Sequence, residues 1–89
     1  MAFSSGETTP AEKPALKFST GEKVLALRKK TGLTQTPFWS RIGLTQSAGS
    51  RYESGRNIPR PVQHLLQLVY GTDKQSAELL TWLRYPGKF

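Results

Sequence analysis

One short stretch of the chain carries several side chains that can bond to the edges of DNA bases. Four residues with polar or charged side chains are spaced so that they would share one face of a helix: Gln46, Ser47, Ser50 and Arg51. Glutamine can bond to adenine, arginine to guanine, and serine to either base. This pattern predicts sequence-specific binding of duplex DNA, and the alternative is an ordinary solvated helix surface.

The distribution of charge also favours a polyanionic partner. The formal net charge is +7, and residues 20–60 supply +6 of it, with eight basic and two acidic residues. Each phosphate that Lys or Arg neutralises releases counterions, so a concentrated basic segment favours nucleic acid. Gln35 is expected at a helix start, where its amide and the free N–H groups can hold a phosphate. An exposed first-turn glutamine is the alternative interpretation.

The sequence gives little support for metal binding, catalysis or membrane insertion. The 89 residues include no cysteine and one histidine, His64, which lacks evident partners for metal binding or base catalysis and is expected to be solvated. No catalytic triad order or phosphate-binding glycine pattern is present, so we expect no enzyme, metal or cofactor. No apolar run approaches the roughly 20 residues of a membrane span, and a cytoplasmic protein is expected.

Two short helices joined by a tight turn would hold the base-contacting residues in place. Thr34 can cap a helix over 35–42, and Thr45 can cap another over 46–54, each ended by a glycine. Two such helices about three residues apart are what a helix-turn-helix requires.

Three further helices complete the predicted all-α bundle. The first begins at a capping box that starts with Ser19 and ends before Gly32. Another is expected over 60–70, and the last from Asp73 until Pro86 breaks it. The apolar stripes of these two later helices are Val62, Leu65, Leu66 and Val69 in the first, and Ala77, Leu79, Leu80 and Leu83 in the second.

The composition divides the chain into one domain with two tails. Residues 1–18 carry few apolar side chains and predict a disordered N-terminal tail, residues 19–85 the domain, and residues 86–89 a C-terminal tail. The C-terminal end is unusually aromatic. Its rings either complete the core or form, with nearby leucines, a homodimer seam or a partner surface; they are Trp82, Tyr85 and Phe89.

Residues 27–70 resemble the lambda-repressor-like helix-turn-helix family, of the Cro and XRE type. The resemblance lies in residues 27–35 (LRKKTGLTQ), 42–46 (IGLTQ) and 50–55 (SRYESG), in one register without gaps. It implies a bundle of about five helices whose third helix enters the major groove, usually as a homodimer on a palindromic site. The function it implies is transcription regulation on a bacterial or phage nucleoid.

The resemblance also assigns roles outside the third helix. Arg56, Asn57 and Arg60 lie where the loop of the family approaches the DNA backbone, so they are candidates for phosphate contacts unless they are plain surface charge. Arg28 and Glu53 match positions that form an ion pair between the first and third helices in some of its repressors. A structural ion pair is therefore expected here.

The sequence departs from the family pattern at two positions. Trp39 stands where a small residue is usual, and Gly49 where Ile or Val is usual. We interpret this as an exchange of volume in which Trp39 packs over Gly49. It would explain a glycine inside a helix despite its cost of about 1 kcal/mol relative to alanine.

Taken together, these patterns predict a non-enzymatic transcription regulator that binds double-stranded DNA. Two alternatives keep the fold and change the target. In one, the chain is an antitoxin-like interaction module whose fifth helix and tails bind a protein, with DNA binding for autoregulation alone. In the other, it binds RNA or any nucleic acid, with steep salt dependence and little sequence preference.

Overall fold

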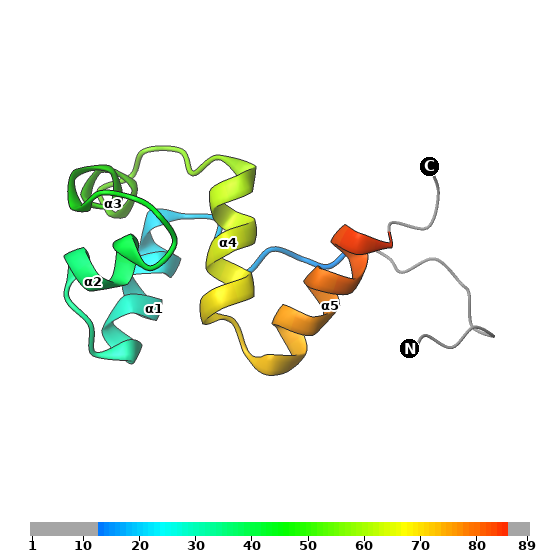
Figure 1. Cartoon of the computed structure of the whole chain (residues 1–89). Helices are drawn as coiled ribbons and strands as arrows, with labels where there is room; N and C mark the ends of the chain where they lie inside the picture. Colours follow the sequence, from blue (N-terminus) through cyan, green and yellow to red (C-terminus); the bar gives the residue numbers. More distant parts are fainter. Residues whose placement is uncertain (1–12, 86–89) are drawn as a thin grey trace.

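A computed structural model describes residues 13–85, and this part of the chain consists of five α-helices without β-strands. The all-α, five-helix architecture predicted from the sequence is thereby confirmed. Residues 1–12 and 86–89, which include the C-terminal tail and Phe89, lie outside the described residues. The helices are α1 (Gly21–Thr31), α2 (Gln35–Ser40), α3 (Gln46–Glu53), α4 (Arg60–Tyr70) and α5 (Asp73–Arg84) (Figure 1).

The helix ends follow local capping signals, with one displaced by a residue. Thr20, not Ser19, caps α1, because its backbone is extended and its hydroxyl accepts the N–H of Lys23. The capping box expected at Ser19 is therefore wrong. A capping box does form at α5, where Thr72 and Gln75 satisfy each other's backbone N–H groups. Helices α2 and α3 end slightly earlier than predicted.

The main core lies between α1, α2, α3 and α4. Phe38 of α2 stacks on Tyr70 of α4 at a ring-centroid distance of 4.2 Å, and the Tyr70 hydroxyl donates a 2.6 Å hydrogen bond to the Phe38 carbonyl. This contact holds α2 against α4. Because α3 packs against α2, the contact also supports the position of α3. The buried side chains of the core are Val24, Leu27, Phe38, Trp39, Ile42, Ile58 and Leu66.

Helix α4 divides its apolar side chains between two surfaces, unlike the single stripe predicted. Leu66 is fully buried in the core, but Leu65 and Val69 are 40% and 43% exposed. The polar side chain of Gln67, on the same helix, is buried instead. The core lies on the side of Leu66, so the neighbouring row of Leu65 and Val69 turns outward.

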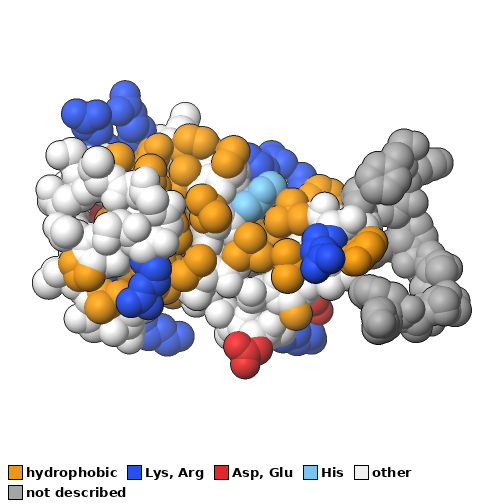
Figure 2. Space-filling view, viewed as in Figure 1, with side chains coloured by type: hydrophobic (Ala, Val, Ile, Leu, Met, Phe, Trp, Pro, Cys, Tyr) orange, Lys and Arg blue, Asp and Glu red, His pale blue; other side chains and the backbone are white. Residues whose placement is uncertain are grey.

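Helix α5 packs against α4, on the side away from α1, α2 and α3 (Figure 1). Leu79 of α5 is buried, whereas Leu80 and Leu83 are 45% and 37% exposed. Hydrophobic side chains therefore gather on the surface of α4 and α5 (Figure 2). We call Leu65, Val69, Leu80 and Leu83 together the α4–α5 apolar surface.

Residues 13–20 run as an extended segment beside α4 before entering α1 (Figure 1). The buried Gln67 holds this segment, since its Oε1 accepts from the Lys17 N–H at 2.7 Å and its Nε2 donates to the Ala15 carbonyl at 3.2 Å. Phe18 packs against the core. Residues 13–18, which the composition places in the tail, are thus attached to the domain by side-chain hydrogen bonds.

Candidate DNA-binding interface

The two helices of the predicted helix-turn-helix are joined by a turn that requires a glycine. Gly43 has a φ of +86°, a left-handed conformation that side chains disfavour. Its N–H donates to the Ser40 carbonyl at 2.9 Å, and the Leu44 N–H donates to the Trp39 carbonyl at 3.0 Å. These bonds end α2 and turn the chain into α3.

Trp39 and Gly49 bring α2 and α3 into close contact. Trp39 is fully buried, and a Cβ on Gly49 would overlap Cγ and Cδ1 of the Trp39 ring. The predicted exchange of volume between these two residues is confirmed. One side of α3 therefore packs against α2, and its opposite side faces solvent.

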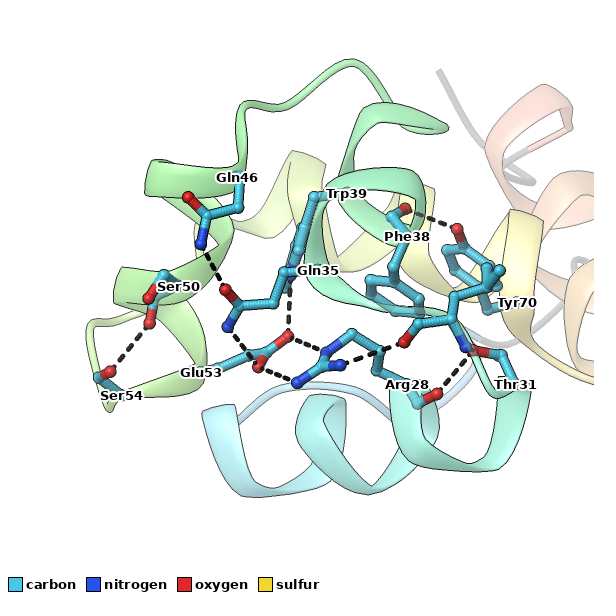
Figure 3. A network of polar contacts seen from close by, with 11 residues as sticks. Arg28, Thr31, Gln35, Phe38, Trp39, Gln46, Ser50, Glu53, Ser54 and Tyr70 are labelled. Atoms are coloured by element: carbon cyan, nitrogen blue, oxygen red, sulfur yellow. Dashed lines mark hydrogen bonds and ion pairs between the residues drawn. The ribbon is translucent and has the colours of Figure 1, made fainter.

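Glu53 connects α3 to both α1 and α2. Within the described residues its carboxylate accepts four hydrogen bonds, of which Arg28 donates two, from Nε at 2.7 Å and from Nη2 at 3.0 Å (Figure 3). Gln35 Nε2 donates at 3.0 Å, and Trp39 Nε1 at 2.9 Å. The Glu53 side chain is only 5% exposed. The Arg28–Glu53 pair expected from the resemblance is thus present, with two further donors that no sequence pattern indicated.

The charges of this pair are stable at neutral pH. Burial by itself raises the pKa of Glu53, but the hydrogen bonds from Arg28, Gln35 and Trp39 outweigh burial and hold that pKa below its ordinary value. The hydrogen bond to Glu53 raises the pKa of Arg28 in turn, against the effect of burial. An ionised carboxylate therefore stands at the junction of three helices.

The candidate base-contacting residues lie on the solvent side of α3. Gln46, Ser47 and Arg51 are exposed, and Ser50 is half-buried. Gly49, between them in sequence, faces Trp39 on the opposite side. The chain thus presents polar side chains from one helical surface, as the spacing predicted; whether they contact bases stays a prediction.

Gln35 has partners that the sequence did not indicate. Its Oε1 accepts a 2.5 Å hydrogen bond from Gln46 Nε2, while its own Nε2 donates to Glu53 (Figure 3). The glutamine predicted to bind a phosphate thus also joins α3 to the buried ion pair. Separations of 11 and 18 residues give no periodic signal, so only the fold could show this link.

The candidate phosphate-contacting residues that follow α3 occupy two places. Arg56, Asn57 and Arg60 are all exposed. Arg56 lines a shallow hollow together with Arg51 of α3. Arg60, by contrast, lines a separate hollow beside Lys13 of the extended segment. The structure therefore groups Arg56 with the exposed side of α3 and places Arg60 apart from it.

His64 is not the solvated residue that the sequence predicted. It is half-buried on α4, and its Nε2 is buried without a hydrogen-bond partner in the described part of the chain. Burial lowers the pKa of His64, and the charges of Arg60 and Lys13 lower it further. Among residues 13–85, no group of three or more metal-binding side chains forms, and no helix has the length and apolar character to cross a membrane.

The comparisons with known proteins point to the same segment. A family model described as the RsaL-like helix-turn-helix (HTH) domain matches residues 25–69, just over half of the chain. The match contains all of α2 and α3 and leaves α5 outside. It supports a helix-turn-helix DNA-binding family, without distinguishing the Cro and XRE type. No match was found among curated proteins or among solved structures.

Proposed function

The chain belongs to the RsaL-like helix-turn-helix domain family, and on this premise we propose that it regulates transcription by binding a specific site in duplex DNA. Helix α3 enters the major groove, where Gln46, Ser47, Ser50 and Arg51 meet the base edges. The observation that carries this proposal is the orientation of α3. Its small residue, Gly49, is packed against α2, and these four polar side chains lie on its solvent side.

Phosphate contacts flank the recognition helix in this proposal. Arg56 shares a hollow with Arg51, which supports a contact of Arg56 with the DNA backbone beside the groove that Arg51 enters. Asn57 and Arg60 extend this contact along the loop, and Gln35 is a further candidate at the start of α2. The position of Arg60, away from the hollow of Arg56, makes it the weakest candidate of the set.

Selection of bound sequences from a random duplex library tests this function. The wild-type chain, Arg51→Ala and Gln46→Ala are compared at one salt concentration, with Lys74→Ala as a control that removes an exposed charge from α5. We expect one consensus that relaxes at a different base pair in each α3 variant and keeps all positions in the control. If no consensus emerges and affinity only falls with salt, the binding is nonspecific and this function is wrong.

A homodimer is the form in which we propose that the chain binds DNA. The α4–α5 apolar surface supports a seam, since its four leucine and valine side chains are each 37–45% exposed on two adjacent helices. Two copies related by a twofold axis would place two α3 helices about one DNA turn apart, on a palindromic site. The same surface favours one other function, an antitoxin-like module bound to a different protein. A second, unrelated chain that copurifies in fixed proportion would favour that alternative.

A further inference from the structure

A hollow lies on the side of α1 that faces away from α3. Gly21 and Arg28 mark the side toward α3, because a Cβ on Gly21 would overlap the α3 backbone and Arg28 donates hydrogen bonds to the Glu53 carboxylate. At about 100° per residue, the opposite side of α1 carries the residues that line the hollow, among them Lys23, Ala26 and Lys30. A duplex bound through α3 would leave this hollow open.

The floor of the hollow is apolar and is formed before any occupant binds. Its volume of about 550 Å³ falls within the roughly 300–1,000 Å³ of small-molecule sites. Tyr70 stacks on Phe38 and donates a hydrogen bond to the Phe38 carbonyl, so its ring is held in one orientation (Figure 3). Leu27 is part of the core, and Phe18 packs against it. The apolar side chains that line the hollow are Phe18, Ala26, Leu27 and Tyr70.

Three exposed lysines line the hollow beside this floor. Lys17 comes from the extended segment, and Lys23 and Lys30 come from α1. The lining contains no acidic residue, and none of the three lysines forms an ion pair within residues 13–85. An anion bound here would be attracted by three ammonium groups at once. Because these lysines lie away from α3, they are also not accounted for by the proposed contacts with DNA.

The junction of α4 and α5 supplies a further donor to the hollow. Thr72 and Gln75 belong to the lining, and the capping box uses Gln75 Oε1, which accepts the Thr72 N–H at 3.0 Å. The Gln75 Nε2 group makes no hydrogen bond within the part of the chain that the structure describes. The hollow therefore offers ammonium and amide donors, which suit a carboxylate because that group only accepts hydrogen bonds.

We propose that this hollow binds a small organic anion with an apolar body, of the class of fatty or aromatic carboxylates. The apolar body packs on Phe18, Leu27 and Tyr70, and the lysines hold the anionic end. A phosphate backbone would satisfy the lysines but leave the apolar floor uncovered, so nucleic acid fits this hollow less well. The inference goes beyond the function proposed above and does not depend on DNA binding.

Three probes of equal apolar length test this site: octanoate, octanol and octylammonium. Titrations followed by the NMR shifts of backbone amides give both the position and the dissociation constant of each probe. We expect octanoate to shift the amides of Ala26, Gly71 and Gln75, and to bind at least about threefold more tightly than octanol, since one exposed ion pair contributes about 1.4- to 5-fold. Octylammonium should bind more weakly than octanol, and added salt should weaken the binding of octanoate.

Variants that remove charge test the role of the lysines. Lys23→Gln with Lys30→Gln removes two of the three charges that line the hollow. The matched control is Lys29→Gln with Lys74→Gln, which removes two exposed charges outside the lining and lowers the net charge equally. We expect the first pair to weaken octanoate binding about three- to tenfold without changing that of octanol. The control pair should bind both probes as the wild type does.

A second pair of variants tests the position of the site. Ala26→Phe fills the hollow with an added ring, whereas Ala77→Phe adds the same ring to an exposed position of α5 outside the lining. We expect Ala26→Phe to abolish the octanoate shifts at Gly71 and Gln75, and Ala77→Phe to retain them. Thermal midpoints of both variants confirm that they are folded at the temperature of the titration.

Several outcomes would overturn the inference. Equal affinities of the wild type for octanoate and octanol would show that the lysines do not select an anion. Octanoate shifts confined to the α4–α5 apolar surface would place the probe elsewhere, and the absence of octanoate binding would rule out the site. Because no probe contains nucleic acid, each of these results leaves the proposed DNA-binding function to its own test.

Discussion

Trp39 of α2 lies directly over Gly49 of α3, so closely that no side chain on Gly49 can be accommodated without movement of the indole ring. The same indole donates its N–H to Glu53 at 2.9 Å. Movement of Trp39 would therefore disturb both the helix contact and the carboxylate that joins α3 to α1. The position of α3 thus depends on this buried ring together with the hydrogen bonds of Glu53.

Gly49→Ala should destabilise the protein although alanine is the better helix former. Overpacking a buried contact costs about 1–3 kcal/mol, which exceeds the gain of about 1 kcal/mol from replacing a helical glycine. We expect the free energy of unfolding, measured by chemical denaturation, to fall by up to about 2 kcal/mol, which is the overpacking cost less the gain in helix propensity. Ser47→Ala, on the exposed side of the same helix, is the control and should change it by less than about 0.5 kcal/mol. A more stable Gly49→Ala variant would mean that the ring is free to move.

Glu53→Gln should destabilise the protein strongly, because Arg28, whose side chain is only 16% exposed, then lacks a countercharge. Breaking a buried pair in this way costs about 3 kcal/mol. The control is Glu78→Gln, since Glu78 is 56% exposed and lies 4.0 Å from Lys74. It should change the free energy of unfolding by less than about 0.5 kcal/mol. Equal effects of the two substitutions would contradict a structural role for Glu53.

The stability contributed by Glu53 should also depend on pH. Its hydrogen bonds hold the pKa of the folded carboxyl below the ordinary value of 4.5, although burial opposes them. As the pH falls below 4.5, the unfolded chain binds a proton before the folded one, so stability is lost through the acid range. Denaturation curves from pH 6 downward should show a steeper loss in the wild type than in Glu53→Gln. Parallel curves would exclude this contribution.

The lowered pKa of His64 predicts a second effect of pH on stability, at higher pH than the effect of Glu53. Burial, with the charges of Arg60 and Lys13, lowers the pKa of folded His64 below its ordinary value of 6.5. As the pH falls below 6.5, the unfolded histidine binds a proton first, so the folded state loses stability. Since the chain contains one histidine, His64→Gln should remove this dependence between about pH 6.5 and 5.5. An unchanged slope in that variant would assign the effect to other groups.

Local signals were sufficient to predict the helices. Thr45 caps α3 as expected, Gly32 ends α1 in a left-handed conformation, and α4 has the predicted bounds. These features depend on a few neighbouring residues, so a single sequence contains them. The packing of Trp39 on Gly49 was also predictable. Trp39 is larger, and Gly49 smaller, than the residues that are usual at these positions in the family that the chain resembles.

The features that the sequence did not reveal depend on distant parts of the chain. The row of Leu65 and Val69 on α4 has helical periodicity, but only the position of the other helices decides that it faces outward. Gln67 is buried because it binds the backbone of residues 15–17, about 50 positions earlier. The contacts of Glu53 with Gln35 and Trp39 are likewise nonlocal. Periodicity locates the helices, whereas hydrogen bonds between polar side chains far apart in the sequence are seen only in the folded structure.

The exposed leucines of α5 carry the last prediction, that of a homodimer. Leu80 is 45% exposed and lies on the α4–α5 apolar surface, whereas the adjacent Thr81 is exposed without contributing a large apolar side chain. Leu80→Gln keeps a helix-forming residue and removes apolar area from the seam, and Thr81→Gln adds the same side chain one position away. In a twofold dimer each substitution acts twice.

Sedimentation measurements over a range of concentrations, with and without the selected duplex, should therefore show a dimer for the wild type and for Thr81→Gln. For Leu80→Gln the dissociation constant should increase at least about tenfold, which corresponds to about 1.4 kcal/mol. Equal dimerisation of both variants would place the seam on another surface. A wild-type chain that remains monomeric even on its palindromic duplex would mean that the α4–α5 apolar surface does not serve the pairing of two recognition helices.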